Sequence, residues 1–481
     1  MKNAILPILL ALLSVPLVAA EPEFPLREDS KPKDGIPKGE MLKGTYTAKP
    51  GSVFPGTVRE YQIYLPPGVD RAGTLPFMVF QDGVIYQAPV VFDNLIARKE
   101  IPPLAGIFVK PGVVPAAHEN ALPRFNRSLE YDSITQDYAT FLIDELLPSL
   151  EKAHGIRLSA DPNDAAISGN SSGGIAAFMV AWHRPDRFRR VFTGVGTYVG
   201  IHGADALPVF VRKMEPKPLR VFLQSGTNDN NLYCGDWWMA NQTMERSLTW
   251  AGYEVSHAWG DGGHNQKHAS QIFPDVLRWL WKDWPGEKAI QANPGGDSKW
   301  KGYEIFETGA MWQAHNGAVP SQADRLTPFG EVAPLTLPDL GAVQFGAAVL
   351  SPDQTLVYAA ETSAPFVHSF QVSPEGKLQN GQRFYQLDTW PADDGAGRGL
   401  CVDVEGRLYV ATAIGIQVCD QAGRVNFIVP TPEPVQDVFF AGDGRSDLIA
   451  RCVDRAYQRA TKTHGLVSRE TPPVKPTAPR L

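Results

Sequence analysis

The chain has 481 residues, of which 43% are hydrophobic and 20% are charged, and its formal net charge is −7. This length exceeds that of one ordinary domain, and the apolar fraction is ample for packed cores, so we expect two domains. The charge is spread along the chain without a run of Lys and Arg, which argues against nucleic acid and anionic membranes as partners.

The first twenty residues have the pattern of an export signal. Lys2 provides a positive start, the apolar run Ile5–Val15 follows, and the small residues Val18–Ala20 precede the polar Glu21. The apolar run is too short to span a bilayer comfortably, and no later stretch is long enough. We therefore expect residues 1–20 to be a cleaved signal peptide and the mature protein to be secreted or periplasmic.

Residues 21–285 alternate short apolar runs with amphipathic stretches, which predicts an α/β domain. The predicted strands are Val58–Leu65, Pro76–Phe80, Gly106–Val109, Ala165–Ser168, Val191–Val195, Arg220–Gln224 and Glu254–Trp259. The predicted helices are Ile134–His154, Gly173–His183, Trp237–Ala251 and Gln271–Trp281. This alternation is typical of a doubly wound, mostly parallel sheet with helices on both faces. The period of two in Val58–Leu65 predicts an antiparallel edge strand.

After residue 285 the sequence no longer alternates strand and helix patterns. Residues 286–301 combine Gly, Pro and charge and are interpreted as a linker. In residues 302–470, short strands follow Asp-containing turns at intervals of forty to fifty residues, as in the blades of a β-propeller. The three repeats seen are too few to close a ring, so we expect a smaller, all-β partial propeller. The proline-rich residues 471–481 are expected to be a disordered tail.

The strongest chemical signal is the motif Gly169–Gly174, which fits G-x-S-x-G. A strand precedes it and a helix follows it, which is the setting of a nucleophilic serine on a tight turn. Ser171 is therefore the candidate nucleophile. The backbone N–H of Ser172, at the helix N-terminus, is a candidate oxyanion donor.

A serine nucleophile needs a base and an acid that orients the base, and these are expected later in the chain, the acid first. Asp229 follows the strand Arg220–Gln224, and His264 ends a glycine-rich segment after the last strand. Asp236, in a nearby loop, is the alternative acid. A second oxyanion donor is expected after the strand Pro76–Phe80, from Gly83 or Val84.

Several aromatic residues lie near the predicted acid and base. Trp237 and Trp238 are candidates for stacking on a sugar or a phenolic acyl group, with core packing as the alternative. None of the four cysteines lies in a CxxC pair, so nothing indicates a zinc site, and the sequence leaves disulfide pairing open.

Five segments together resemble the enterochelin-esterase family of α/β-hydrolases, in the same order and over roughly residues 40 to 285. They are Met78–Gly83, Arg127 with Glu130-Tyr131, Gly169–Gly174, Gly226–Asp229 and Gly260–His264. The resemblance implies an α/β-hydrolase domain acting as a serine ester hydrolase without a cofactor. It matches Ser171, His264 and Asp229 to nucleophile, base and acid, and it adds Arg127 as a substrate-binding candidate. Small-molecule or polysaccharide esters, such as feruloyl or acetyl esters of carbohydrates, are the expected substrates.

The C-terminal region resembles the regucalcin/gluconolactonase propellers in Ser351–Ala360 and in Gly399–Ala411. That family binds a divalent cation at the ring centre through acidic and amide side chains. This chain departs from the pattern, because Arg398 stands where an Asp is usual and Gln436-Asp437 replaces Thr-Asn. We therefore expect no metal site. A metal-dependent lactonase in this region and a non-catalytic carbohydrate-binding scaffold are the alternative functions, and the oligomeric state is left open.

Overall fold

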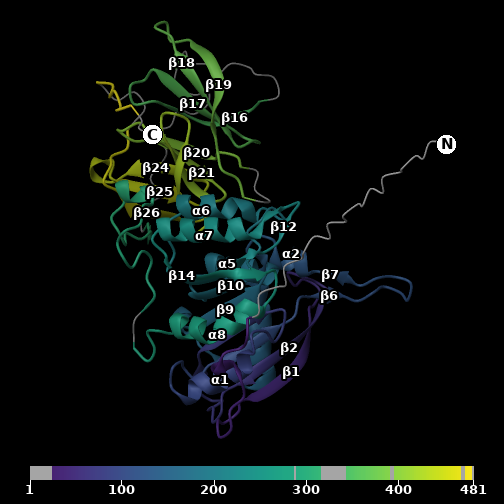
Figure 1. Ribbon diagram of the computed structural model, residues 1–481. Helices are drawn as coiled ribbons and strands as arrows, with labels where there is room; N and C mark the ends of the chain where they lie inside the picture. The colour runs from purple at the N-terminus through teal and green to yellow at the C-terminus, as the bar shows by residue number, and fades with distance from the viewer. Residues whose placement is uncertain (1–23, 287–288, 316–342, 391–394, 467–471, 479–481) are drawn as a thin grey trace, which may run out of the picture.

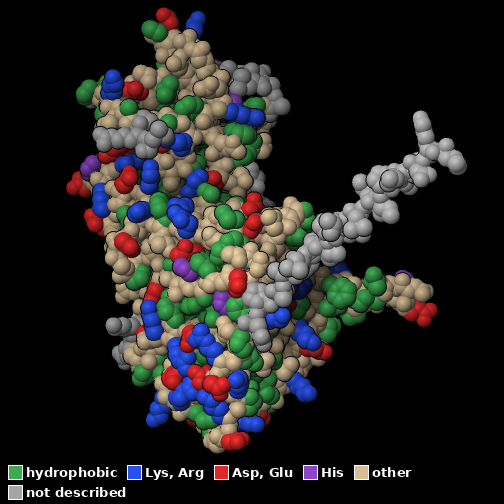
Figure 2. All heavy atoms as spheres, viewed as in Figure 1, with side chains coloured by type: hydrophobic (Ala, Val, Ile, Leu, Met, Phe, Trp, Pro, Cys, Tyr) green, Lys and Arg blue, Asp and Glu red, His purple; other side chains and the backbone are tan. Residues whose placement is uncertain are grey.

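The computed structural model describes residues 24–286, 289–315, 343–390, 395–466 and 472–478. The predicted signal peptide lies outside these ranges, as do parts of the predicted linker and tail. Within them, no helix has the length and apolarity needed to cross a membrane. All four cysteines are free thiols. Lys and Arg side chains are interspersed with Asp and Glu over the face seen in Figure 2.

The N-terminal unit, residues 24–286, is built on a ten-stranded sheet (Figure 1). Its order is β14-β11-β10-β9-β4-β5-β2-β6-β7, with β1 paired to β2. The strands are β1 (Glu40–Thr47), β2 (Val58–Leu65), β4 (Phe77–Gln81), β5 (Ala105–Val109), β6 (Val113–Val114), β7 (Arg124–Phe125), β9 (Ala165–Asn170), β10 (Arg190–Gly194), β11 (Arg220–Asn228) and β14 (Glu254–Gly263).

The six strands from β14 to β5 are parallel, and β4, β5, β9 and β10 are buried along their whole length. Such burial explains why these strands read as continuous apolar runs in the sequence. Val58–Leu65 was predicted to be an antiparallel edge strand; the antiparallel direction is confirmed, and the edge position is wrong. β2 is antiparallel, but it lies inside the sheet because β1 and β5 flank it.

Helices cover both faces of the sheet. The apolar side chains of α1 (Ala88–Ala97) and α8 (Lys267–Leu280) pack with those of β4 and β5 in one core. Those of α4 (Leu147–His154), α5 (Ser172–His183), α6 (Leu207–Lys213) and α7 (Trp237–Trp250) pack in the other. The shorter helices are α2 (Arg127–Tyr131) and α3 (Asp137–Thr140). The helix predicted over 134–154 is α3 and α4 joined by a π-helical segment, Phe141–Leu146.

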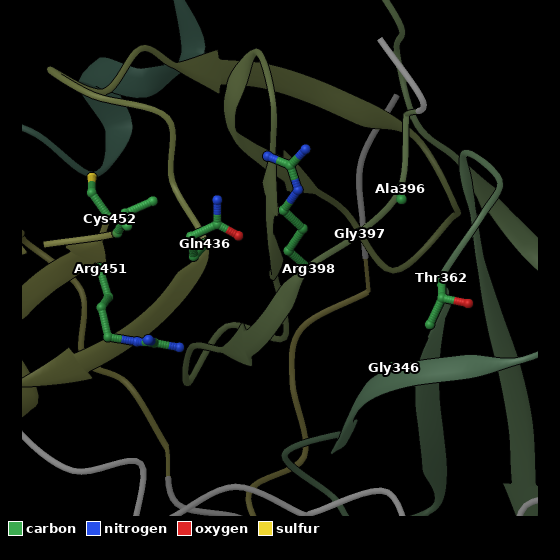
Figure 3. A pocket seen from close by; sticks show the side chains of 9 residues that line it. Gly346, Thr362, Ala396, Gly397, Arg398, Gln436, Arg451 and Cys452 are labelled. Carbon is green, nitrogen blue, oxygen red and sulfur yellow. The ribbon is translucent and has the colours of Figure 1, made fainter.

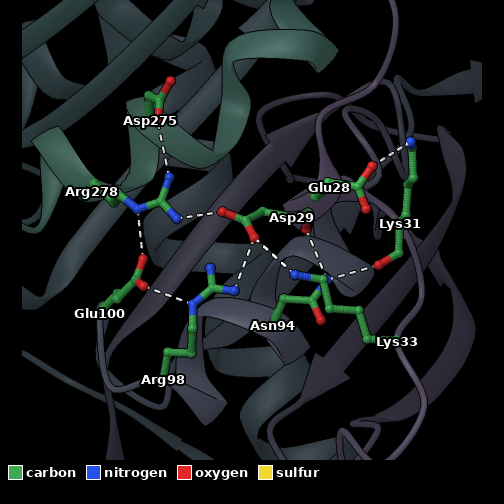
Figure 4. A network of polar contacts seen from close by, with 9 residues as sticks. All are labelled: Glu28, Asp29, Lys31, Lys33, Asn94, Arg98, Glu100, Asp275 and Arg278. Atoms are coloured by element: carbon green, nitrogen blue, oxygen red, sulfur yellow. Dashed lines mark hydrogen bonds and ion pairs between the residues drawn. The ribbon is translucent and has the colours of Figure 1, made fainter.

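The start of the described chain is fastened to this unit by a network of charges (Figure 4). Asp29 forms ion pairs with Arg98 (2.9 Å), Arg278 (2.5 Å) and Lys33 (3.1 Å). Burial would raise the pKa of Asp29, but the bonds from these three cations hold it well below its ordinary value. The charged carboxylate therefore joins α1, α8 and the N-terminal segment.

The C-terminal unit, residues 302–466, contains three four-stranded antiparallel sheets among its described residues. The first is β16 (Phe345–Leu350), β17 (Leu356–Glu361), β18 (Phe366–Val372) and β19 (Leu378–Gln386). The second is β20 (Gly399–Val402), β21 (Leu408–Thr412), β22 (Gly415–Cys419) and β23 (Val425–Val429). The third is β24 (Asp437–Ala441), β25 (Asp447–Arg451), β26 (Ala456–Ala460) and β15 (Gln313–Ala314). These match the three predicted repeats, and β15 adds a strand from the beginning of the unit to its last sheet.

The two units are docked through the end of α6 (Figure 1). Met214 forms a parallel backbone bridge with Ile428. Lys213 pairs with Asp388 at 2.6 Å, and the side-chain oxygens of Glu215 accept two bonds from Arg459, each 2.8 Å long. The segment between the units is also tied down, since Ile290 is buried and donates its N–H to the side chain of Asn163 at 3.0 Å.

Candidate active site

The turn between β9 and α5 holds Ser171 in a backbone conformation that few non-glycine residues adopt. Its φ and ψ are 60° and −123°, and its N–H donates to the carbonyl of Gly194 at 2.9 Å. The glycines of the motif make this turn possible. A Cβ on Gly169 would lie 2.1 Å from the carbonyl oxygen of Gly173, and one on Gly173 would lie 2.9 Å from Cβ of Gln81. The sequence motif therefore encodes a close backbone crossing that presents the serine side chain.

Three of the predicted residues form a hydrogen-bonded row. The Oγ of Ser171 lies 2.7 Å from Nε2 of His264, and Nδ1 of His264 lies 2.6 Å from Oδ1 of Asp229. The carboxylate of Asp229 is fully buried and also accepts bonds from Ser225 Oγ (2.7 Å) and from the N–H of Asn230 (2.8 Å). Because these two donors fix the carboxylate, its Oδ1 selects the tautomer of His264 that carries hydrogen on Nδ1 and leaves Nε2 free to accept.

The alternative acid, Asp236, has a different position. It is the N-cap of α7, where Oδ1 accepts the N–H of Met239 at 3.0 Å. A carboxylate in this place satisfies one of the free amides of the first turn. Asp229 is thus the carboxylate that contacts His264, and Asp236 starts the helix that packs beside it.

Thr197 is a site residue that the sequence did not reveal. Its Oγ1 lies 3.3 Å from Ser171 Oγ and accepts the indole N–H of Trp237 at 3.1 Å, while its own N–H donates to the Ser171 carbonyl at 3.2 Å. It lies after β10 in a Gly-Val-Gly-Thr segment that carries no recognisable motif. Thr197 therefore holds both the backbone and the side chain of the serine.

The prediction that Trp237 contacts substrate does not fit its burial. Only 3% of the residue is exposed, and its ring meets that of His264 edge to face, with centroids 5.5 Å apart. Trp237 therefore packs behind the base. Trp238 is half-buried and meets Trp259 edge to face at 5.4 Å, which leaves it as the aromatic candidate for substrate contact.

The candidate oxyanion donors differ in their availability. The N–H of Gly83 donates to the carbonyl of Val109 at 3.1 Å, as part of the junction between β4 and β5. This leaves Val84 as the second candidate, beside the amide of Ser172 at the start of α5.

The loop that carries Val84 is held in an unusual shape. Asp82, Tyr86 and Gln87 all have positive φ, between 56° and 66°. Such conformations cost about 1–3 kcal/mol each and persist where surrounding contacts enforce them. One such contact is the bond from Tyr86 Oη to the carbonyl of Gly169 at 3.0 Å. Burial raises the pKa of Tyr86, so this phenol stays protonated and donates.

Arg127, predicted to bind substrate, is engaged with this loop. Its Nε and Nη2 donate to the two carboxylate oxygens of Asp82 at 2.8 and 2.9 Å. A bidentate pair of this kind fixes both partners. Arg127 therefore lies against the loop that carries Val84, and its substrate-binding role stays a prediction.

A hollow of about 230 Å³ lies between this loop and the beginning of α8. Val84, Ile85, Gln87, Gln266 and Ser270 are among the residues that line it. Val84, the candidate oxyanion donor, is thus part of its wall.

The described residues include no group of three or more His, Cys, Asp or Glu side chains arranged to hold a metal ion.

Two family models match the chain. Residues 52–268 match the Esterase family, described as "Putative esterase". Residues 309–450 match the SMP-30/Gluconolactonase/LRE-like region.

Individual proteins are also similar over parts of the chain. The iron(III) enterobactin esterase of Dickeya dadantii (strain 3937) is 31% identical over 152 residues, covering 28% of this chain and 33% of that protein. The enterobactin esterase of Shigella flexneri is 19% identical with a TM-score of 0.40, over 52% of this chain and 61% of that chain. A ferulic acid esterase of Anaeromyces mucronatus is 18% identical with a TM-score of 0.40, over 52% of this chain and 93% of that chain.

The match thus spans one third of the length of the curated relative. The two family models cover different parts of the chain, which agree with the N-terminal and C-terminal units of the fold. Residues 52–268 are therefore similar to the Esterase family, and residues 309–450 are similar to the SMP-30/Gluconolactonase/LRE-like region.

Proposed function

We propose that the chain hydrolyses carboxylic esters, with Ser171 as nucleophile, His264 as base and Asp229 as the acid that orients His264. The observation that carries this proposal is the row of bonds from Ser171 Oγ to His264 Nε2 (2.7 Å) and from His264 Nδ1 to Asp229 Oδ1 (2.6 Å). His264 Nε2 takes the proton as Ser171 Oγ attacks the ester carbonyl carbon. The buried charge of Asp229 stabilises the imidazolium that forms.

The backbone N–H groups of Ser172 and Val84 are proposed to hold the negative oxygen of the tetrahedral intermediate. His264 then gives its proton to the leaving alcohol, and an acyl ester on Ser171 remains. Water attacks this ester with His264 again as base, which releases the acid and restores the serine. Thr197 keeps Ser171 Oγ in place throughout, through the contact at 3.3 Å.

Feruloyl or acetyl esters of carbohydrates are the proposed substrates, and the proposed location is outside the cytoplasm after removal of residues 1–20. The first proposal is supported by the family resemblance of the sequence motifs, by the half-buried Trp238 beside Trp259 and by the hollow next to Val84. The second is supported by the charge and apolar pattern of the first twenty residues. Because the curated relative is named an iron(III) enterobactin esterase, enterobactin belongs in the same test.

The test is hydrolysis of 4-nitrophenyl acetate by the mature chain, by Ser171→Ala and by a control, Ser133→Ala, whose hydroxyl bonds to the carbonyl of Leu129. We expect Ser171→Ala to lose activity and Ser133→Ala to keep it. Retained hydrolysis in Ser171→Ala would overturn the assignment. A panel of feruloylated and acetylated oligosaccharides, enterobactin and a lactone then identifies the substrate by the largest kcat/KM.

A further inference from the structure

A cavity of about 580 Å³ lies where the three sheets of the C-terminal unit meet (Figure 3). Gly346, Thr362, Arg398, Gln436 and Arg451 are among its lining residues, and none of the described residues that line it is Asp or Glu. A divalent cation takes carboxylate and carbonyl oxygens as ligands. The residues present therefore do not fit the cation that the propeller resemblance implies.

Another cavity, of about 610 Å³, lies between the two units. On the N-terminal side it is lined by the start of α3, the end of α5 and the segment that follows α6. On the C-terminal side it is lined by Trp390, the turn 413–415 and the loop 430–434. Its volume is in the range of sites for small molecules. Because both units form its wall, a molecule bound there would contact both.

Two rings of this wall are fixed by one backbone carbonyl. Nε2 of His183 lies 2.8 Å from the oxygen of Ile134, and the indole N–H of Trp390 donates to the same oxygen at 3.1 Å. The two rings meet edge to face, with centroids 6.0 Å apart. Burial lowers the pKa of His183 to about 4, so this imidazole is neutral at pH 7. The wall is therefore held in place here without adding a charge.

Lys217 lines the same cavity and is half-buried. Its Nζ donates to the carbonyl of Trp182 at 2.6 Å and lies 4.4 Å from the centre of the Trp182 ring. Among the described residues it forms no ion pair, and burial lowers its pKa to about 7. An ammonium group has three N–H donors, and the bond to Trp182 uses one of them. Lys217 thus lacks the opposite charge that a buried ammonium needs.

The acidic residues among those that line the cavity have other partners. Asp137 is exposed to solvent, and its Oδ2 accepts a bond from Thr135 Oγ1 at 2.9 Å. Glu433 accepts a bond from Tyr457 Oη at 2.6 Å and lies 3.4 Å from Nη1 of Arg455. Water screens the charge of Asp137, and Arg455 offsets that of Glu433. The charge of Lys217 is therefore the one left for a ligand to neutralise.

The C-terminal side of the cavity offers apolar surfaces. Pro430, Pro432 and Pro434 alternate along the loop between β23 and β24, and Ile414 lies in the turn between β21 and β22. Trp390 adds an indole ring, which packs edge to face on Phe210 with centroids 4.6 Å apart. Rings of this kind favour contact with another flat ring. The cavity thus combines one cation with a largely apolar opposite wall.

We propose that this cavity binds a small aromatic carboxylate, with the acid group paired to Lys217 and the ring against Trp390 and the three prolines. A carboxylate beside Nζ favours the charged amine, so it raises the pKa of Lys217. At a pH above 7 the free amine is mostly neutral, and binding then takes up a proton. His183, Asp137 and Glu433 also face Lys217 across the cavity, and none of them is paired with it.

The test is isothermal titration calorimetry of the mature full chain at pH 8 with 2-naphthoate, 2-naphthamide and acetate. These probes carry both the ring and the acid, the ring alone, or the acid alone. We expect 2-naphthoate to bind and the other two to bind at least about tenfold more weakly. No heat from 2-naphthoate, or equal binding of the amide, would overturn the proposal.

The same titration in Tris and in HEPES measures the proton. Because these buffers differ in their heat of ionisation, uptake of a proton by Lys217 should make the two heats of binding differ in the direction of proton uptake. Affinity should also fall as the pH rises from 7 to 9, since more of the amine is neutral before binding. Equal heats in the two buffers would overturn the pairing with Lys217.

Variants place the binding in the cavity. Lys217→Met removes the amine at similar length, and it should weaken binding of 2-naphthoate by about tenfold or more and abolish the proton uptake. Ala413→Trp fills the cavity from an exposed position of the other unit and should also weaken binding. The matched control is Lys152→Met, an exposed lysine of α4, which should bind as the wild type does.

Unchanged affinity in both cavity variants would overturn the proposal, because binding at the candidate active site would survive them. Near-ultraviolet circular dichroism checks that each variant is folded, and if Lys217→Met is not, Ala413→Trp carries the test. The measurement does not depend on ester hydrolysis.

Discussion

The substitution Asp229→Asn tests whether Asp229 orients His264, and the hydrogen bonds of Asp229 let the expected loss of kcat/KM be calculated. Asn has the shape of Asp but no charge, and one of its two terminal atoms is a donor. Oδ1 of Asp229 accepts from both His264 Nδ1 and the N–H of Asn230, whereas Oδ2 accepts from Ser225 Oγ. Placing the amide oxygen at Oδ1 keeps both N–H bonds, and the hydroxyl of Ser225 can rotate to accept from the NH₂ group.

This arrangement decides how large the loss should be. With the amide oxygen toward His264, the useful tautomer is retained and only the charge is lost. A hydrogen bond to a charged group contributes about 1.5–3 kcal/mol, so we expect kcat/KM to fall by roughly 10- to 150-fold. If the amide instead turned its NH₂ toward His264, the wrong tautomer would form and the loss would be on the order of 10⁴-fold.

The assay is kcat/KM for 4-nitrophenyl acetate, with Asp236→Asn as the matched control. Asn caps a helix about as well as Asp, so this control should keep both α7 and the wild-type activity. Loss of activity in Asp236→Asn with full activity in Asp229→Asn would refute the assignment of the acid. A loss near 10⁴-fold in Asp229→Asn would refute the argument from Ser225 and Asn230.

Three further outcomes follow from the geometry. Thr197→Val should lose activity, and its free energy of unfolding in a denaturant titration should fall by about 1–3 kcal/mol, because the buried indole N–H of Trp237 loses its acceptor. An unchanged free energy of unfolding would contradict this. Gly169→Ala should give a misfolded or strongly destabilised protein by circular dichroism, since its Cβ would lie 2.1 Å from the Gly173 oxygen, and a folded, active variant would exclude that crossing. Burial and the charge of Lys217 lower the pKa of His183 from 6.5 to about 4. Between these pH values the unfolded chain binds a proton at His183 that the folded chain does not bind. The free energy of unfolding should therefore fall by at most about 3 kcal/mol as the pH falls from 6.5 to 4. His183→Gln should show a smaller fall in the same chemical-unfolding series, and an equal fall would contradict the assignment.

Local patterns predicted much of the fold because they express burial directly. The buried parallel strands appear as apolar runs, and the glycines around Ser171 indicate the strand–turn–helix. The helix α1 was missed because Ala88–Ala97 is short and apolar, and because Gln87, which precedes it, has a left-handed backbone without a side-chain cap. The interior position of β2 depends on its pairing with β1, which no local pattern encodes.

Candidate site residues could be predicted where their order along the chain and the strands before them are informative. They could not be predicted where their role depends on contacts between distant segments. Ser171 and His264 follow strand ends, so their sequence context predicted that they lie close together, and their side chains are 2.7 Å apart. The choice between Asp229 and Asp236 depends on which carboxylate reaches the imidazole across the sheet. Likewise, the amide of Gly83 is occupied because β4 and β5 are neighbours.

Thr197, Trp237 and Arg127 illustrate the same limit for polar and aromatic side chains. Each looks ordinary in the sequence, and its role is set by one distant partner. Those partners are Ser171 for Thr197, Thr197 for Trp237 and Asp82 for Arg127. Trp237 is 3% exposed, and Arg127 forms a bidentate ion pair with Asp82.

The central claim is that Ser171 is an activated nucleophile, and covalent labelling with a fluorophosphonate tests it most directly. The account predicts one adduct, mapped by peptide mass spectrometry to Ser171, and no adduct in Ser171→Ala. Labelling of a different residue, or no labelling of the folded wild-type chain, would contradict the account.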